Sequence, residues 1–295
     1  MSEALLSVEG LSVDFRSGGL GRRSFRAVDD ASFHIDRGET LGLVGESGSG
    51  KSTIGRAILG LAPVSEGSIR FRGQDITHLS RAQRRKSAGG IQVVFQDPYS
   101  SLNPSMTIGE ILAEPLVARG DRRTGAMEKI STLLRQVGLP ADARSRYPRQ
   151  FSGGQRQRIA IARALALEPE LIVCDEPVSA LDLTTQAIVL DLFIDIQRRT
   201  GVSYLFVSHD LAVIRHISHR VAVMRRGELV EVGDGDQVTS RPEHPYAQRL
   251  LLASPVSDPA EQEQRRAERH RLLAEQRSVD SPVSASAVQS PGVRP

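Results

Sequence analysis

The fold is decided by the stretch Gly45-Glu46-Ser47-Gly48-Ser49-Gly50-Lys51-Ser52. It matches the phosphate-binding pattern G-x-x-x-x-G-K-[ST] at every fixed position. The apolar residues 40–44 before it predict a buried strand, and residues 53–61 after it predict a helix. Glycines let backbone N–H groups approach a phosphate closely, and the positive end of a helix attracts the anion.

The same pattern assigns roles to individual side chains. Lys51 is expected to reach the β- and γ-phosphates of a nucleotide, and Ser52 to bind Mg²⁺. Lys51 is one of only three lysines among 38 basic residues, which suggests that a compact ammonium is needed there. A glycine-rich turn with a chance lysine is the alternative. The predicted nucleotide-binding residues of this stretch are Gly45, Glu46, Ser47, Gly48, Ser49, Gly50, Lys51, Ser52 and Thr53.

The composition is that of a soluble globular protein. The chain has 295 residues, of which 39% are hydrophobic and 25% charged, enough for one large domain or two smaller ones. No apolar run approaches the roughly 18–20 residues of a membrane span, and the N-terminus lacks a signal-peptide pattern. Cys174 is the only cysteine, which excludes an internal disulfide and any all-cysteine iron–sulfur or zinc site. We therefore expect a cytosolic protein.

The charge pattern does not favour nucleic acid as a partner. The net charge is only +3, and the arginines are dispersed among acidic residues. The chain has no basic stripe with interleaved aromatic residues. We therefore expect no nucleic-acid binding.

Strands and helices are predicted to alternate, which indicates an α/β sheet with a largely parallel core. The segment 97–150 is predicted to be helical and rich in loops and to form a separate helical subdomain, and residues 17–23 are predicted to form a loop. Strands are predicted at 11–15, 31–35, 40–44, 69–72, 91–95, 171–174 and 203–207, helices at 155–167, 183–199 and 211–217, and a hairpin at 221–232.

Two carboxylates end the apolar strand predicted at 171–174. In an enzyme with this phosphate-binding loop, Asp175 would lie beside Ser52 and hold Mg²⁺, directly or through water. Glu176 lies where a carboxylate can polarise the attacking water. Capping of a helix or turn is the alternative role for such an acidic pair. Because the pair follows a phosphate-binding loop, we favour the catalytic role.

A second candidate anion site opens the helix predicted at 155–167. The sequence there offers a hydroxyl, flexible backbone N–H groups and a helix dipole. A plain helix N-cap is the alternative. One nucleotide needs only one phosphate-binding loop, so a second site requires an explanation. The residues of this site are Ser152, Gly153, Gly154 and Gln155.

This second site resembles the signature motif of ATP-binding cassette (ABC) proteins. In that family the motif binds the γ-phosphate of the ATP held by a partner subunit. The resemblance spans residues 5–255, and it implies roles for further residues. Gln96 resembles the Q-loop glutamine that contacts Mg²⁺ or water, Asp182 belongs to a D-loop that crosses the dimer interface, and His209 resembles the switch histidine at the γ-phosphate. Phe15 resembles the aromatic residue that stacks on adenine, with Phe25 as a competitor.

Three segments resemble one subfamily more closely, the importers of oligopeptides, dipeptides and nickel. They are residues 95–104, residues 147–151 and the run His244-Pro245-Tyr246. The last is a proline-fixed turn that leads into a short apolar helix, with packing on the core as its alternative role. The subfamily's cysteine-rich tail, which some members use for an iron–sulfur cluster, is absent because the chain has one cysteine.

The resemblance implies a P-loop NTPase fold with a RecA-like core sheet, an antiparallel β subdomain at the N-terminus and a helical signature subdomain. We expect the ATPase core at 1–95 and 156–235, the helical subdomain at 96–155 and a C-terminal extension at 236–258. Residues 259–277 are a solvated helix at best, and 278–295 are expected to be disordered.

The resemblance further implies an ATP-hydrolysing subunit of a bacterial ABC importer for peptides or similar small solutes, with ATP and Mg²⁺ as cofactors. Its implied partners are a second ATPase subunit (a paralogue or a second copy), two transmembrane permease subunits and an extracytoplasmic solute-binding protein. Its expected place is the cytoplasmic face of the bacterial plasma membrane. An exporter ATPase is one alternative. The other is an ABC protein of DNA repair or translation, but the chain has neither a long coiled coil nor a second phosphate-binding loop.

Overall fold

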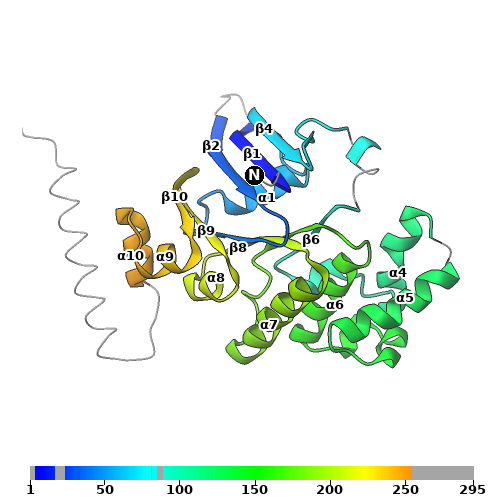
Figure 1. Cartoon of the computed structure of the whole chain (residues 1–295). Helices are drawn as coiled ribbons and strands as arrows, with labels where there is room; N and C mark the ends of the chain where they lie inside the picture. Colours follow the sequence, from blue (N-terminus) through cyan, green and yellow to red (C-terminus); the bar gives the residue numbers. More distant parts are fainter. Residues whose placement is uncertain (1–3, 17–23, 81, 85–88, 122, 254–295) are drawn as a thin grey trace, which may run out of the picture.

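A computed structural model describes residues 4–16, 24–80, 82–84, 89–121 and 123–253. These residues form two sheets (Figure 1). The four-stranded sheet has the order β2-β1-β4-β5, and the six-stranded sheet has the order β10-β9-β3-β8-β7-β6. The loop predicted at 17–23 and the tail predicted at 259–295 lie outside the described residues.

The four-stranded sheet is antiparallel and comes from the N-terminal part of the chain. Its two long strands extend well beyond the short strands predicted at 11–15 and 31–35, because the pairing continues through several irregularities of register. Gly10, with a φ of +60°, lies at one of these irregularities. The bounds are Leu6–Arg16 for β1, Ser24–Ile35 for β2, Glu66–Phe71 for β4 and Gln74–Asp75 for β5.

The six-stranded sheet carries the phosphate-binding loop at its centre. Its strands from β9 to β6 are parallel, and only the edge strand β10 is antiparallel, as a hairpin partner of β9. The prediction of an α/β fold with an antiparallel β subdomain is therefore confirmed. The bounds are Thr40–Val44 for β3, Ile91–Val94 for β6, Leu171–Asp175 for β7, Ser203–Ser208 for β8, Arg220–Arg225 for β9 and Glu228–Asp234 for β10.

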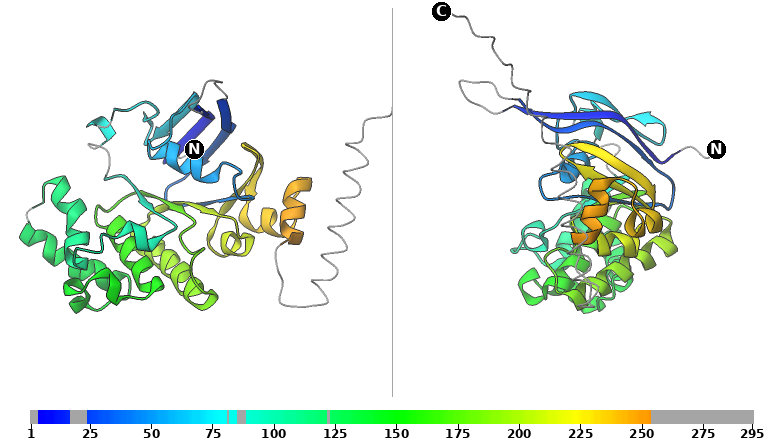
Figure 2. Two further views of the ribbon diagram at one scale, coloured as in Figure 1. Left: turned by 180° about the vertical axis from the view of Figure 1, so that it is seen from behind. Right: turned by 90° about the vertical axis from the view of Figure 1, so that its left-hand side faces the viewer.

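Helices cover this sheet and extend beyond both of its edges (Figures 1 and 2). The helices α4 and α5 lie at one end of the molecule, and α9 and α10 lie at the other, beyond β10. The bounds of the helices that cover or flank the sheet are Lys51–Ile58 for α1, Gly153–Leu165 for α6, Leu183–Thr200 for α7, Leu211–Ile217 for α8, Gly235–Ser240 for α9 and Pro245–Ala253 for α10. The segment 97–150 holds α3 (Pro98–Ser101), α4 (Ile108–Arg119), α5 (Arg123–Gln136) and the 3-10 turns Ala141–Ser145 and Pro148–Gln150.

The parallel strands are buried on both faces, which explains their continuous apolar sequences. Alternate residues of β7 point to different hydrophobic clusters: Leu171 and Val173 join the cluster around α1 and the antiparallel sheet, whereas Ile172 and Cys174 join the cluster around α6 and α7. This double burial fixes the strand ends that carry the site. Among the described residues, no helix is both long and apolar enough to span a membrane.

Candidate functional site

The phosphate-binding loop connects β3 to α1, at the carboxyl end of the parallel strands. At Gly45 and Gly50 the backbone of the loop lies too close to other parts of the same chain to leave room for a side chain. A Cβ on Gly50, whose φ is +110°, would lie 2.3 Å from the carbonyl oxygen of Ala27. The sequence can therefore form this loop only with glycine at that position.

Lys51 lies inside the loop that precedes it. Its side chain is buried, with 4% of the residue exposed, and its Nζ donates hydrogen bonds of 2.8 Å to the carbonyl oxygens of Gly45 and Glu46. Burial lowers the pKa of Lys51, and the carboxylates of Glu176 and Asp175 partly offset this effect. The Lys51 ammonium is thus held inside the phosphate-binding loop. The oxygens of a bound phosphate would provide negative charge that stabilises this buried cation.

The metal site predicted from the sequence is assembled at the first turn of α1. The hydroxyl of Ser52 donates a 2.6 Å hydrogen bond to Oδ1 of Asp175, at the end of β7. A hydroxyl and a carboxylate are hard oxygen donors, and Mg²⁺ commonly takes one or two protein ligands together with phosphates and waters. The described residues contain no cluster of three or more His, Cys, Asp or Glu side chains that could hold a metal without such help. The residues therefore fit a magnesium ion that arrives with a nucleotide.

Glu176 follows Asp175 and has a strained backbone. Its φ is +50°, a left-handed conformation that side chains rarely adopt, and its N–H donates to the carbonyl oxygen of Val207 on β8. Its Oε2 lies 3.1 Å from Nδ1 of His209, which follows β8. The Glu176 side chain is 17% exposed and the His209 side chain 54%. The pair therefore borders solvent, where a water molecule can reach the carboxylate.

Two further predicted site residues, Gln96 and Phe15, are also among the described residues. Gln96 is exposed and follows β6, the strand that pairs with β7, so both end at the same sheet edge. Phe15 and Phe25 are direct cross-strand partners on β1 and β2, and they are 40% and 65% exposed. Direct partners share one face of a sheet, so the two candidates for the adenine contact are neighbours rather than separate sites.

The signature residues form a helix cap. The hydroxyl of Ser152 accepts from the N–H of Gln155, and Oε1 of Gln155 accepts from the N–H of Ser152. Asp182 caps α7 by accepting hydrogen bonds from the N–H and the hydroxyl of Thr185, and these bonds hold the pKa of Asp182 below its usual range. The helix cap that is the alternative role of the signature residues is thus present, and Asp182 also caps a helix.

The signature cap and the phosphate-binding loop remain separate within the chain. In the part of the chain that the structure describes, no hydrogen bond or ion pair joins residues 152–155 to residues 45–53. The structure thus brings together five of the predicted site residues: Lys51, Ser52, Asp175, Glu176 and His209. It does not join the signature residues to them.

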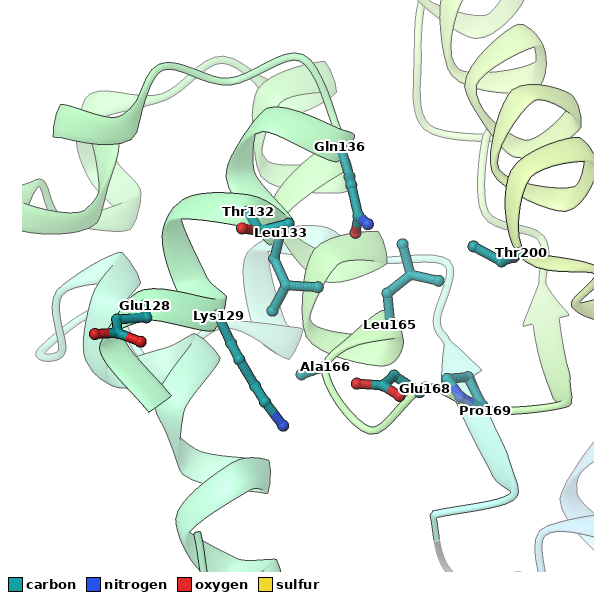
Figure 3. A pocket seen from close by; sticks show the side chains of 10 residues that line it. All are labelled: Glu128, Lys129, Thr132, Leu133, Gln136, Leu165, Ala166, Glu168, Pro169 and Thr200. Atoms are coloured by element: carbon teal, nitrogen blue, oxygen red, sulfur yellow. The ribbon is translucent and has the colours of Figure 1, made fainter. Parts of the chain in front are cut away.

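A pocket lies elsewhere in the molecule, between α5 and the C-terminal ends of α6 and α7 (Figure 3). Its volume is about 520 Å³, and its lining includes Lys129, Leu133, Leu165 and Glu168. None of the predicted site residues lines it.

Comparisons with known proteins match the chain to a family. Residues 28–179 match the family model described as ABC transporter. The glutathione import ATP-binding protein GsiA of Pectobacterium atrosepticum is 47% identical over 289 residues, which cover 96% of this chain and 45% of the relative. The putative peptide import ATP-binding protein BOV_A0347 of Brucella ovis is 48% identical and covers 86% of this chain and 80% of the relative.

The fold matches a solved cassette as well. The dimeric structure of the ATP-binding cassette MJ0796 in a post-hydrolysis state, bound to ADP and phosphate, aligns with a TM-score of 0.67 and 29% identity. The alignment covers 78% of this chain and 98% of that chain. This chain spans less than half the length of GsiA.

Proposed function

Because this chain belongs to the ABC transporter family, as an ATP-binding cassette, we propose that it binds and hydrolyses MgATP to drive the import of peptides or glutathione-like solutes. The observation that carries the proposal is the convergence of Lys51, Ser52, Asp175, Glu176 and His209 at one sheet edge, beside a phosphate-binding loop. The names of the two relatives, glutathione import and peptide import, supply the solute class.

The chemistry follows from the positions of the side chains. A magnesium ion held by Ser52 and Asp175, with Gln96 at the edge, would neutralise charge on the phosphate oxygens. Glu176 accepts a proton from water as the water oxygen attacks the γ-phosphorus, and the bond from that phosphorus to the leaving oxygen of ADP breaks. His209 orients the Glu176 carboxylate and contacts the γ-phosphate. The backbone of Glu176, fixed by β7 and β8, sets the position of the base.

The signature residues act on a second nucleotide. Residues 152–155 make no described hydrogen bond or ion pair with their own phosphate-binding loop, and they lie at a helix N-terminus with a partly exposed cap. We propose that they close over the ATP of a partner cassette, with Asp182 at the shared interface. Adenine would stack on the surface formed by Phe15 and Phe25. ATP then favours the closed dimer, and hydrolysis releases it.

The proposed partners follow from the same mechanism. They are a second cassette, two permease subunits and a solute-binding protein, with this chain on the cytoplasmic face of the membrane. The segment 96–155 is proposed as the unit that carries the signature and contacts the permeases, and 236–258 as the C-terminal extension. An exporter ATPase is the second candidate, and a cassette without membrane partners is the third. The importer names of the two relatives favour the first.

Affinity purification of the tagged protein from its native membranes tests the assignment. We expect permease subunits and a solute-binding protein to co-purify, identified by mass spectrometry. The Lys51→Ala variant serves as a control for nucleotide-dependent assembly. Recovery of an exporter membrane domain, or of translation or repair factors without any permease, would contradict the proposal.

A further inference from the structure

The phosphate-binding loop has an outer side that faces the C-terminal part of the chain. The carbonyl oxygen of Ser49 accepts a 2.9 Å hydrogen bond from the N–H of Gly227, in the turn between β9 and β10. The hydroxyl of Tyr246, on α10, accepts a 3.1 Å hydrogen bond from the N–H of Glu46. Tyr246 lies 200 positions beyond Glu46 in the chain, so α10 reaches back to the nucleotide site.

The Tyr246 side chain is held firmly in this position. Only 4% of the residue is exposed, and the guanidinium carbons of Arg225 and Arg249 lie 5.2 and 5.8 Å from its ring centroid. Burial raises the pKa of the phenol, so the hydroxyl remains neutral at physiological pH. A fixed ring with a neutral hydroxyl is suited to hold one backbone N–H in one place.

The turn before α10 is itself anchored to the sheet. The two carboxylate oxygens of Glu231, on β10, accept 2.9 Å hydrogen bonds from the N–H groups of Glu243 and His244. Nδ1 of His244 in turn accepts from the N–H of Tyr246, and Pro245 begins the helix between them. The position of the Tyr246 hydroxyl is therefore determined by β10, through a short chain of hydrogen bonds.

We propose that Tyr246 is a positioning residue for the phosphate-binding loop, through which the C-terminal helix α10 sets the affinity of the nucleotide site. The proposal rests on the proposed function, because it assumes that this loop binds nucleotide. A loop with glycines at positions 45, 48 and 50 can adopt many backbone conformations, and only some of them direct its N–H groups at a phosphate. Loss of the Tyr246 bond lowers the fraction of loops in the competent conformation, and the apparent affinity falls by the same fraction.

The test is the affinity for MgADP, measured by calorimetry on the full chain. We expect Tyr246→Phe to weaken it about three- to tenfold, the equivalent of one lost hydrogen bond, while the melting temperature of the nucleotide-free protein stays near that of the wild type. Tyr204→Phe is the matched control, because the buried Tyr204 hydroxyl donates a bond of the same 3.1 Å length to the carbonyl oxygen of Phe193. That variant should lower the melting temperature and leave the affinity unchanged.

A second variant separates positioning from packing. Glu231→Gln loosens the turn before α10 without touching the loop, so it should weaken MgADP binding in the same direction. Combined with Tyr246→Phe, it should add nothing further, because both changes act through one hydrogen bond. Unchanged affinity in Tyr246→Phe, or full additivity in the double variant, overturns the inference alone. A wild-type protein that binds no MgADP overturns the proposed function and the inference together.

Discussion

Oε2 of Glu176 and Nδ1 of His209 lie 3.1 Å apart, at the ends of the adjacent parallel strands β7 and β8. The strands are paired up to Asp175 and Val207. Glu176 follows Asp175 directly, and His209 follows Ser208, the last residue of β8, so both lie where the two strands end side by side. Glu176 makes this contact from a left-handed backbone conformation, with a φ of +50°. In the proposed hydrolysis, Glu176 accepts the proton from water and His209 orients the Glu176 carboxylate.

The Glu176→Gln variant should retain ATP binding, while turnover falls by about 10²-fold or more because an amide cannot accept the proton from water. Trapped ATP should then stabilise a dimer, measurable by light scattering. Glu170→Gln is a matched control, since Glu170 immediately precedes β7, at the opposite end of the strand from Glu176, and pairs with Arg37. Near-normal hydrolysis by Glu176→Gln in the assembled transporter would rule out the assignment.

The contact between Ser52 and Asp175 predicts how the metal affects binding. In the wild type, Mg²⁺ should tighten ADP binding, because the Ser52 hydroxyl and the Asp175 carboxylate lie where a phosphate-bound cation needs oxygen ligands. Asp175→Asn should abolish most of that tightening and leave the metal-free affinity almost unchanged. Titrations with Mg²⁺ and with EDTA measure both values. An undiminished magnesium effect in the variant would place the metal elsewhere.

The separation of signature and loop within the chain predicts two distinct defects. Lys51→Ala should weaken nucleotide binding to the isolated subunit, because its buried ammonium lies within the loop. Ser152→Arg should spare that binding but block closure over the partner's nucleotide, and so prevent ATP-dependent dimerisation. If Ser152→Arg instead abolishes binding to the isolated subunit, the motif has only a local structural role.

The close contact of α6 with α7 predicts a stability effect at Gly154. A Cβ added there would lie 2.2 Å from Cγ2 of Thr185, whose hydroxyl donates to Asp182. Gly154→Ala should therefore destabilise the fold by about 1–3 kcal/mol. Thr185→Ser removes Cγ2 and keeps the hydroxyl, so the double variant should recover most of the loss in urea unfolding. Equal stability of Gly154→Ala and the wild type would contradict this contact.

The segment after Gln96 is expected to contact the permeases. Tyr99 is 60% exposed, and the guanidinium carbon of Arg156 lies 4.1 Å from its ring centroid. Charged or bulky substitutions at Tyr99 and Ser101 should reduce transport while the ATPase activity of the isolated subunit stays intact. Parallel transport and ATPase assays check this. Unimpaired transport, or an unfolded variant, would place the contact in another segment.

Much of the fold followed from local sequence patterns. Continuous apolar runs predicted β3, β7 and β8. These strands are buried on both faces of the sheet, so nearly all of their residues are apolar and each strand appears in the sequence as one unbroken run. The strands β1 and β2 were predicted too short, since their bulged pairing interrupts the period of two. The helix after the loop begins at Lys51 rather than Thr53, because the glycine at position 50 serves as its N-cap.

The contacts that position the site could not be predicted from sequence patterns. The hydrogen bond from Glu46 to Tyr246 joins residues 200 positions apart, and the Gly154–Thr185 contact depends on how two helices pack. Glu176 has a φ of +50° where it leaves β7 and donates its N–H to Val207 on β8, and no local residue preference indicates this conformation. Tertiary packing alone determines these features.

ATP-dependent solute uptake is the measurement that tests the proposed function most directly. The complex purified with its permeases and solute-binding protein would be reconstituted in vesicles, with ATP and Mg²⁺ on the side of this chain and labelled glutathione or short peptides on the other. We expect the solute to accumulate on the side of this chain, and this accumulation should be lost in Glu176→Gln. ATP-driven movement in the opposite direction, or equal uptake by the wild type and Glu176→Gln, would contradict it.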